Sequence, residues 1–516
     1  MSNANLYALL ASGFPADRDA VAIQTPQRGY TWSDVDRMSA RIAAFLAGLR
    51  LPDGARVAVQ VEKSPEALML YLGTLRAGLV YLPLNTAYRA DEIAYFLGDA
   101  EPSVVVCGSA NLSWVAPLAG EARVLTLDED GCGSLMDACA QADAHFEPVQ
   151  RRADDLAAIL YTSGTTGRSK GAMLSHGNLA SNAQVLHDYW GWSADDVLLH
   201  MLPIFHVHGL FVASHGALLA GARMIWLPKL DVEQALHYLP ECTMMMGVPT
   251  YYVRLLADPR FTRETCRNMR LFISGSAPLL TETFDEFQRR SGHTILERYG
   301  MSETVMLTSN PYREADGSRI GGTVGRPLPG VSLRVVDDEG QLLGEGRTGH
   351  VQVKGPNVFS GYWRMPEKTR EEFTPDGWFR TGDVGRWGSA EGDTDASVPG
   401  DYLSIVGRSK DLIISGGYNI YPKEIETVID TWPGVAESAV IGVPHPDFGE
   451  AVVAVVVPRP GVQLAADEII AGLKGRIANF KVPKQVHVVQ ELPRNTMGKV
   501  QKNVLRTAYG ASSQPV

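Results

Sequence analysis

Cysteine is scarce in this sequence, with five residues among 516. No two of them form a Cys-x-x-Cys pair. An odd number of cysteines without paired spacing favours neither a disulfide framework nor a zinc site. We therefore expect each one to be a small apolar residue of the interior; they are Cys107, Cys132, Cys139, Cys242 and Cys266.

Long basic runs and long apolar runs are also missing. Acidic side chains outnumber basic ones by 58 to 47, which gives a formal net charge of -11 and no stripe of Lys or Arg for a phosphate backbone. No stretch approaches the ~20 apolar residues that cross a bilayer, and residues 1–11 have neither a basic n-region nor a cleavage site. These absences argue against nucleic acid as a partner and against a membrane span, and we expect a cytoplasmic protein.

The sequence does contain a regular alternation of apolar β-branched runs with helical patterns. Residues 56–61 predict a strand, and residues 103–107 predict another. Between them, Ser64 before Pro65 is typical of a helix N-cap, and Gly78 ends the same helix. The alternation predicts an α/β fold of layered sheets and helices.

The length of the chain predicts more than one domain, because 516 residues exceed the usual size of a single core. Residues 388–401 are acidic, small and almost free of apolar side chains, which predicts an exposed loop. A second compact α/β unit of about 100 residues is expected after this loop. Its strands are predicted at residues 402–406, 437–442, 451–457 and 485–489, and a helix at residues 466–477.

The strongest local motif is YTSGTTGRSKG at residues 161–171, directly after an apolar strand expected at residues 156–161. Its glycines, hydroxyls and basic side chains can present N–H groups and a cation to a polyphosphate. It is not a Walker A loop, because two residues separate Gly167 from Lys170. A flexible surface turn is the alternative, but turns seldom show this order of residues directly after a buried strand.

Six segments, in order along the chain, resemble the motifs of one family. They are YTSGTTGRSKG at 161–171, GSAP at 275–278, YGMSET at 299–304, WFRTGD at 378–383, GRSKD at 407–411 running on to Gly417, and PRNTMGK at 493–499. Together they resemble the adenylate-forming superfamily of acyl-CoA synthetases, luciferases and peptide-synthetase adenylation domains. The resemblance covers essentially the whole chain.

This resemblance implies a fold, an activity and a set of small-molecule partners. The implied fold has a large N-terminal domain of layered α/β subdomains at residues 1–408, with the ATP and acyl sites. A small mobile C-terminal α/β domain at residues 409–516 carries the catalytic lysine. The implied reaction joins a carboxylic acid to AMP and then transfers the acyl group to a thiol, with ATP, Mg2+ and coenzyme A taking part.

The resemblance also implies roles at the nucleotide. Tyr299 would stack on adenine beside the turn at 275–278, where glycine permits close backbone approach. Asp383 would accept both ribose hydroxyls, with Arg408 assisting. Taken alone, an Asp after a Gly is usually a turn residue. The further implied ATP contacts are Thr162, Ser163, Gly164, Thr166, Gly167, Lys170, Ser276, Ala277, Pro278, Glu297, Gly300, Met301, Ser302 and Thr304.

Three residues are implied in catalysis, namely Lys499, Glu303 and Thr165. Glu303 and Thr165 would hold Mg2+, a hard cation that accepts a few carboxylate and phosphate oxygens with water. Lys499 would offset the repulsion between the two reacting anions. A carboxylate and a phosphate about 4 Å apart repel by ~4 kcal/mol at an effective dielectric near 20. A lysine ammonium on a long stem can bridge both anions. A solvated tail lysine is the alternative, and the matching PRNTMGK segment favours the catalytic role.

Thioester formation needs a different arrangement, because a thiol cannot reach the adenylate while Lys499 occupies the same space. The resemblance implies that the C-terminal domain rotates about a hinge at Lys410. Gly416 and Gly417 would then face a pantetheine tunnel, where missing side chains leave room for a narrow ligand.

Arg298 bears on the choice of acid. Relatives commonly have a small residue immediately before the Tyr-Gly pair, where this chain has Arg298. A buried arginine is costly without an anion, and a guanidinium can hold the second carboxylate of a dicarboxylic acid bidentately. With PIFHVHG at 203–209, the pattern resembles malonyl-CoA synthetases, so malonate is favoured and methylmalonate is a second candidate. His206 and Ser274 are the other expected acyl contacts.

Alternatives remain open at this pocket. Arg298 could pair with Glu297 or Glu303 instead of with a substrate. The His-x-His spacing of residues 206–208 could suggest a metal, but no third ligand is recognisable, so a pocket wall is favoured.

Other functions fit parts of the sequence. A ligase for short- or medium-chain monocarboxylates, a stand-alone adenylation enzyme that loads a carrier protein, and a luciferase-type oxygenase share the nucleotide motifs. No carrier is expected in the short tail after Lys499. The joint presence of Lys170, Glu303 and Lys499 argues against a non-catalytic regulator, and the missing Gly-Lys-Ser/Thr argues against a P-loop kinase. Relatives are often inactivated by acetylation of the lysine matching Lys499, so a lysine acetyltransferase and a deacetylase are expected partners.

Overall fold

The computed structural model describes residues 3–162, 169–391, 398–415, 418–445, 449–474, 476–477, 479–495 and 498–510. Contacts divide the chain into two units. The first comprises Met1–Gly321, Arg326–Ser332 and Val353–Phe379, and the second comprises Gly322–Gly325, Leu333–Gln352 and Arg380–Val516. This division does not fall at residue 409, since residues 380–408 group with the second unit. A mobile domain hinged at Lys410 stays a prediction.

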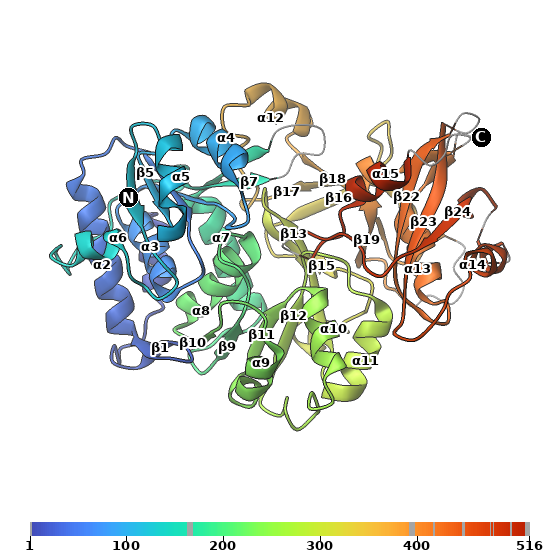
Figure 1. Ribbon diagram of the computed structural model, residues 1–516, viewed down its shortest axis with the longest axis horizontal. Coiled ribbons are helices and arrows are strands. Elements are labelled where there is room, and N and C mark those ends of the chain that lie inside the picture. The colour runs from blue at the N-terminus through green and yellow to red at the C-terminus, as the bar shows by residue number, and fades with distance from the viewer. Residues whose placement is uncertain are drawn as a thin grey trace. The chain divides into compact units, whose positions relative to one another are not determined.

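The first unit contains two mainly parallel sheets (Figure 1). In the nine-stranded sheet the central strands from β1 to β13 are parallel, and antiparallel partners flank them at both edges. Its strands, in spatial order, are β15 (Arg326–Pro327), β14 (Val305–Ser309), β13 (Ile295–Met301), β12 (Leu271–Ser274), β11 (Met244–Gly247), β9 (Val197–His200), β10 (Arg223–Trp226), β1 (Val21–Gln24) and β2 (Gly29–Thr31).

The six-stranded sheet of this unit ends in the hairpin that carries the phosphate-loop motif. Strands β7 and β8 pair antiparallel, and the remaining strands are parallel. Its order is β6 (Arg123–Thr126), β5 (Val104–Cys107), β3 (Arg56–Gln60), β4 (Val80–Pro83), β7 (Leu156–Thr162) and β8 (Lys170–Ser175). The central strands β3, β4 and β5 are almost wholly buried, as expected for parallel strands covered on both faces.

Helices cover both sheets. A buried apolar cluster joins α9, α10 and α11 to β9 through β13, and a second cluster joins α4 and α5 to the six-stranded sheet (Figure 1). The helices of the first unit are α1 (Leu6–Ala11), α2 (Trp32–Gly48), α3 (Pro65–Arg76), α4 (Ala90–Ala100), α5 (Leu112–Val115), α6 (Ser134–Cys139), α7 (His176–Tyr189), α8 (His215–Ala220), α9 (Val232–Tyr238), α10 (Pro249–Ala257), α11 (Thr281–Ser291) and α12 (Pro366–Glu372).

Helix α3 shows how the local sequence sets an element. Ser64 accepts a hydrogen bond from Ala67 N, Pro65 occupies the first turn, and Gly78 follows the helix with a φ of 70°. These predicted start and stop signals are confirmed. The helix is buried along its whole length, because α1 and α2 pack against it.

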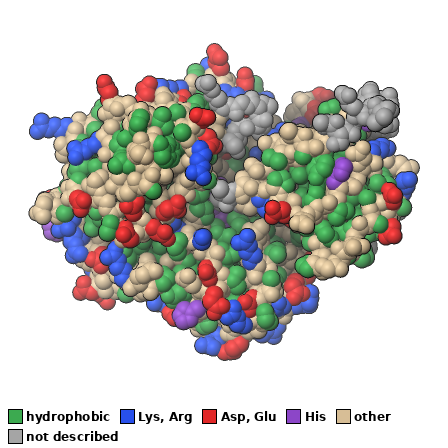
Figure 2. Space-filling view, in the orientation of Figure 1, with side chains coloured by type: hydrophobic (Ala, Val, Ile, Leu, Met, Phe, Trp, Pro, Cys, Tyr) green, Lys and Arg blue, Asp and Glu red, His purple; other side chains and the backbone are tan. Residues whose placement is uncertain are grey.

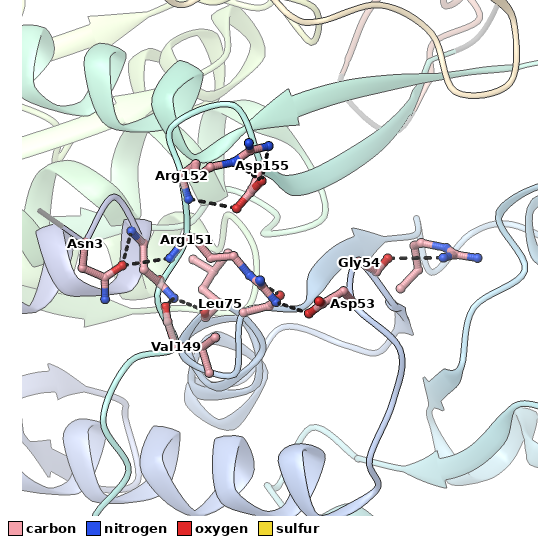
Figure 3. A network of polar contacts seen from close by, with 11 residues as sticks. Asn3, Asp53, Gly54, Leu75, Val149, Arg151, Arg152 and Asp155 are labelled. Atoms are coloured by element: carbon pink, nitrogen blue, oxygen red, sulfur yellow. Dashed lines mark hydrogen bonds and ion pairs between the residues drawn. The ribbon is translucent and has the colours of Figure 1, made fainter. Parts of the chain in front are cut away.

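A polar network fixes the segment that leads into β7 (Figure 3). The Asn3 side chain accepts a hydrogen bond from Arg151 N, and the Arg151 guanidinium donates to Gly78 O and to Asp53. The side-chain amide of Asn5 donates to Leu75 O and Val149 O, at 2.8 and 2.9 Å. These bonds tie the N-terminal segment and the end of α3 to the entry of the strand that precedes the phosphate loop.

The second unit is built on two smaller sheets. One has the order β16 (Ser332–Val336), β17 (Gly349–Lys354), β18 (Phe379–Trp387) and β19 (Leu403–Arg408). The other has the order β21 (Tyr418–Ile420), β20 (Ile413–Ser415), β23 (Gly449–Pro458) and β22 (Val435–His445), with β24 (Gln485–Val488) also on β23. Alternate residues of β22 and β23 enter two apolar clusters on opposite faces of that sheet.

The helices of the second unit cover both faces of its larger sheet. Helices α13 (Pro422–Asp430) and α14 (Ala466–Leu473) pack on one face, and α15 (Lys502–Gly510) packs on the other. The predicted helix at residues 466–477 begins correctly but ends at Leu473.

The surface agrees with the charge pattern of the sequence. On the face drawn in Figure 2, acidic and basic side chains of the first unit are interspersed. Within the described ranges, no helix is long and apolar enough to cross a membrane. Four cysteines are buried as expected, but Cys132 is exposed, so that prediction was wrong for Cys132.

Candidate functional site

The phosphate-loop hairpin brings two predicted ATP residues face to face. Thr162 ends β7 and Lys170 begins β8, and the two are register partners. The Lys170 ammonium lies 3.3 Å from Glu372 Oε1 and 4.2 Å from the centre of the Tyr362 ring. Lysine is thereby held at the base of the loop. The loop residues Ser163, Gly164, Thr165, Thr166 and Gly167 lie outside the described residues.

Glu303 belongs to the same cluster. Its carboxylate accepts hydrogen bonds from Tyr362 OH at 3.0 Å and from Thr162 Oγ1 at 3.4 Å, and the residue is buried. The described residues contain no group of three or more His, Cys, Asp or Glu side chains that could hold a metal. One carboxylate beside the hairpin that carries the predicted phosphate loop suits Mg2+, which binds through few protein oxygens together with phosphate and water. Glu303 therefore fits the predicted magnesium role.

The predicted adenine turn lies at the carboxyl ends of two adjacent parallel strands. Ser274 ends β12 and pairs with Glu297 of β13, so the turn after β12 and Tyr299 lie at one sheet edge. Ser276 has a φ of 71°, which is unusual for a residue with a side chain. Gly300 allows no side chain, because a Cβ there would lie 1.9 Å from Val305 O.

The remaining residues predicted at the nucleotide flank this edge. Ala277 is half-buried, Pro278 is exposed, Met301 ends β13, and Ser302 follows it. Thr304 is fully buried, and its hydroxyl has no hydrogen-bond partner among the residues with described positions. The structure places this set together, while contact with ATP stays a prediction.

Arg298 is buried without an anion. It lies on β13 with 3% of its surface exposed, and its Nε and Nη2 atoms have no partner in the described part of the chain. Among the described residues no acidic side chain contributes to the pKa of Arg298, so the alternative of a pair with Glu297 or Glu303 is not seen there. A Cβ at Gly275 would lie 2.3 Å from Nη1, so the guanidinium rests against bare backbone. Burial lowers the pKa of Arg298 to about 9, although Tyr252 opposes the shift.

Uncharged polar groups gather near this guanidinium. Ser274 Oγ and His208 Nε2 are buried and have no partner among the residues that the structure describes. His208 Nδ1 lies 3.4 Å from Ser276 Oγ, and the His208 amide donates to His206 Nδ1 at 3.4 Å. Burial and the nearby Arg298 charge lower the pKa of His206 to about 4 and that of His208 well below its usual range. Both rings are neutral at pH 7, so Arg298 supplies the positive charge.

The predicted ribose residues are neighbours in the second unit. Asp383 on β18 and Arg408 on β19 are register partners, and Arg408 Nε lies 3.0 Å from Asp383 Oδ1. Asp383 lies within β18 and is 4% exposed, so it is not a residue of an exposed turn, which was the alternative from the sequence. The pairing orients the carboxylate, and its contact with ribose stays a prediction.

Lys499 lies on the loop before α15 in the same unit. Its amide donates to Asn495 Oδ1 at 2.9 Å, and its carbonyl accepts from Asn495 N. Burial, followed by the positive charge of Arg408, lowers the pKa of Lys499 to about 8, although Asp383 opposes the shift. The lysine is therefore a cation whose charge is lost in a mildly alkaline range.

Lys410 lies in the short turn Ser409–Asp411 that follows β19. Burial lowers its pKa, and the neighbouring Arg408 lowers it further. Asp411 accepts a hydrogen bond from Arg506 of α15 at 2.8 Å. The predicted coenzyme A residues Gly416 and Gly417 lie outside the described residues.

Comparison with known proteins decides the family. The sequence profile of the AMP-binding enzyme family matches residues 11–363, and that of the AMP-binding enzyme C-terminal domain matches residues 424–499. The chain is an AMP-binding enzyme. The predicted adenylate-forming resemblance and its α/β fold are thereby confirmed.

This AMP-binding enzyme has similar relatives of more than one acid preference. A malonate–CoA ligase of Arabidopsis thaliana is 33% identical, over 95% of this chain and 86% of its own. An indoleacetate–CoA ligase of Aromatoleum aromaticum is 35% identical, over 94% of both chains. The crystal structure of ATP-bound MatB from Rhodopseudomonas palustris is 54% identical, with a TM-score of 0.94, over 99% of this chain and 100% of its own.

Several residues of the site were missed by sequence reasoning. Tyr362 and Glu372 flank Lys170, yet they lie about two hundred positions further along the chain and belong to none of the six motifs. The Phe-Ser-Gly-Tyr-Trp segment at 359–363 is a weak signal that could have drawn attention to Tyr362. Nothing in the sequence pointed to Lys63 and His200, which contact each other in the interior of the first unit.

Proposed function

We propose that this AMP-binding enzyme is a malonate–CoA ligase. It would convert malonate, ATP and coenzyme A to malonyl-CoA, AMP and pyrophosphate through an acyl-adenylate. Methylmalonate is a second candidate substrate, since it has the same two carboxylates. Malonate–CoA ligases occur among the relatives of the chain.

The observation that carries the choice of acid is the buried guanidinium of Arg298, whose Nε and Nη2 have no partner among the described residues. A buried charge without a partner is costly, and a bound carboxylate removes that cost. The distal carboxylate of malonate can accept from Nε and Nη2 of Arg298, the two atoms without partners. Ser274 Oγ and His208 Nε2 offer two further hydrogen bonds to the same ligand.

An aromatic acid is the second candidate, because an indoleacetate–CoA ligase and a feruloyl-CoA synthase are each 35% identical to the chain. Neither acid has a second carboxylate. An aromatic ring would leave the Arg298 charge buried and uncompensated, so the electrostatics of the pocket favour malonate over these acids.

The nucleotide half of the proposal assigns roles to the clustered residues. Lys170 and Glu303 would bind the phosphates and Mg2+, which offsets charge on the phosphate oxygens. Asp383 and Arg408 would bind ribose. Lys499 would bridge the attacking carboxylate and the α-phosphate, and rotation about Lys410 would then admit the thiol. A cytoplasmic location and control by acetylation of Lys499 complete the proposal; mass spectrometry of the cellular protein tests the modification.

The test compares Arg298→Ala with Arg298→Lys in a pyrophosphate-release assay over malonate, methylmalonate, acetate, indoleacetate and ferulate, with and without coenzyme A. Removing one partner of a desolvated charge pair costs about 2–4 kcal/mol. We therefore expect kcat/KM for malonate to fall roughly 30- to 700-fold in Arg298→Ala, and less in Arg298→Lys, while acetate turnover is unchanged. An unchanged ratio of malonate to acetate would contradict the assignment. Release of ADP instead of AMP would reject the ligase mechanism.

A further inference from the structure

A second buried basic side chain, Lys63, lies in the first unit outside the groups assigned above, and burial lowers its pKa well below the usual range. It lies between β3 and α3, and its ammonium nitrogen is 2.9 Å from His200 Nδ1, 2.9 Å from His200 O and 2.7 Å from Leu227 O. The same nitrogen lies 4.4 Å from the ring centre of Trp226. His200 ends β9 and Leu227 follows β10, so Lys63 links the six-stranded sheet to the nine-stranded sheet.

Lys63 forms no ion pair with an acidic side chain in the described ranges, so its role is not that of a salt bridge. Two carbonyl oxygens and His200 Nδ1 surround the Lys63 nitrogen, which donates to the carbonyl oxygens. Burial lowers the pKa of His200 well below its usual range, so the ring is neutral and carries one proton. Nε2 lies 3.1 Å from Gly209 O, which can only accept, so the proton resides on Nε2 and Nδ1 accepts from Lys63.

The protonated Nε2 of His200 faces the turn that forms the acyl pocket. It lies 3.1 Å from Gly209 O and 3.1 Å from Ser214 Oγ, and the Ser214 hydroxyl also donates to Gly209 O at 2.9 Å. With the opposite tautomer, an Nε2 lone pair would face the carbonyl oxygen. The hydrogen bonds therefore run in one direction, from Lys63 through His200 to Gly209 O.

Gly209 is a constrained point of this turn. It lies in the π-helix His208–Ser214. In a π-helix each backbone hydrogen bond joins residues five positions apart instead of four, and this rare form is frequent at functional sites. A Cβ at Gly209 would lie 2.1 Å from Pro203 O, so the backbone passes very close to the segment that precedes it. His208 precedes Gly209 directly, and its amide donates to His206 Nδ1, so a shift of the Gly209 peptide is expected to change the placement of both rings relative to Arg298.

We infer that Lys63 and His200 are positioning residues for acid selection, which hold Gly209 O and thereby place His206 and His208 beside Arg298. The inference rests on the proposed function, in which this pocket binds the second carboxylate of malonate. Neither residue touches the acid. They act by keeping the polar side of the pocket in one arrangement, so their loss should affect recognition of malonate more than binding of ATP.

Two substitutions of His200 separate its two bonds. In His200→Gln the amide nitrogen takes the place of Nε2 and can still donate to Gly209 O. In His200→Asn the shorter side chain can still accept from Lys63 but no longer reaches Gly209 O. Lys63→Met removes the N–H donor to His200 and keeps a side chain of similar length. Ser214→Ala removes the hydroxyl that also donates to Gly209 O, and it is the mildest of these changes.

The readouts are kcat/KM for malonate and for acetate, KM for ATP, and thermal unfolding. We expect His200→Asn to lower the malonate-to-acetate preference roughly tenfold, through KM for malonate, with KM for ATP unchanged, and Lys63→Met to lower it by about threefold. His200→Gln should stay within about threefold of the wild type, and Ser214→Ala should shift the preference in the same direction by about threefold.

Equal effects of His200→Gln and His200→Asn on the malonate-to-acetate preference would overturn the inference. It would also be overturned if Ser214→Ala and a stably folded His200→Asn both kept the wild-type preference. A lower melting temperature with unchanged preference would show a purely structural role and would also overturn it. Failure of the proposed function looks different: the wild-type enzyme itself would not turn over malonate, or its turnover would not depend on Arg298.

Discussion

Arg298 in the first unit and Lys499 in the second are both cations largely withdrawn from water, yet their surroundings differ. Arg298 lies on a β-strand, 3% exposed, and neutral polar groups surround it. Lys499 lies on a loop, and charges of both signs, from Arg408, Lys410, Asp383 and Asp411, act on it. Both pKa values are lowered by burial, to about 9 and about 8.

The difference indicates two uses of a buried positive charge. A guanidinium on a rigid strand keeps its proton at neutral pH and offers a fixed, planar set of donors, which suits selection of a ligand. An ammonium on a loop is more easily deprotonated and moves with its backbone, which suits a group that acts in one step and then leaves. We expect changes at Arg298 to alter the choice of acid, and changes at Lys499 to alter the rate of one half-reaction.

The largest expected effect separates the two half-reactions. In Lys499→Ala, adenylate formation should fall by about 100- to 1,000-fold, because the charge between two anions is lost. Conversion of supplied malonyl-adenylate to malonyl-CoA should be nearly unchanged. Pyrophosphate release measures the first step, and thioester formation from synthetic adenylate measures the second. Equal loss of both steps would contradict a role confined to adenylation.

A second expected effect concerns Arg298 and the stabilisation of the protein by bound malonate. Malonate bound at 100 times its Kd should stabilise the wild-type protein by about 2.7 kcal/mol, which thermal unfolding detects as a higher melting temperature. Arg298→Ala should lose this shift, while Lys499→Ala should retain it, because the proposed contact to the second carboxylate is made by Arg298 of the first unit. Acetate serves as the control ligand. A shift that survives in Arg298→Ala would show that another residue binds the acid.

The sequence predicted the parts of the site that are local and missed those that depend on long-range packing. Asp383 and Arg408 were placed at the ribose by their motifs, and the structure pairs them across two antiparallel strands. Tyr362 and Glu372 were missed, because their contact with Lys170 joins segments far apart in the chain. The Lys63–His200 bond spans 137 positions and forms only where two sheets meet.

The same distinction explains the smaller errors. The strand-to-loop motifs after β7 and β12 were predicted, since a buried strand followed by glycine is a local pattern. The end of α14 was missed although Gly472 and Gly475 stand next to Leu473 in the sequence, where glycine is a signal for the end of a helix. Whether Arg298 was paired depended on side chains from several strands, which a sequence pattern cannot place.

The smallest expected effect is a pH dependence that begins near pH 8 and belongs to Lys499, since the pKa of Arg298 is lowered only to about 9. Because the pKa of Lys499 is lowered from 10.5 to about 8, its ammonium is lost as pH rises through 8 in the free enzyme. The kcat/KM of pyrophosphate release should therefore fall by up to tenfold per pH unit above about pH 8. The free energy of unfolding should change in the opposite direction: between pH 8 and 10.5 the unfolded chain binds more protons at Lys499 than the folded chain, so the contribution of this residue to stability rises with pH.

The expected result is a loss of activity without unfolding, and circular dichroism at each pH checks that the protein stays folded. Lys499→Arg, which stays charged, should be slower, but its activity should not begin to fall at pH 8, whereas Arg298→Lys should retain the fall that begins at pH 8. An identical fall in Lys499→Arg would assign the titration to another group.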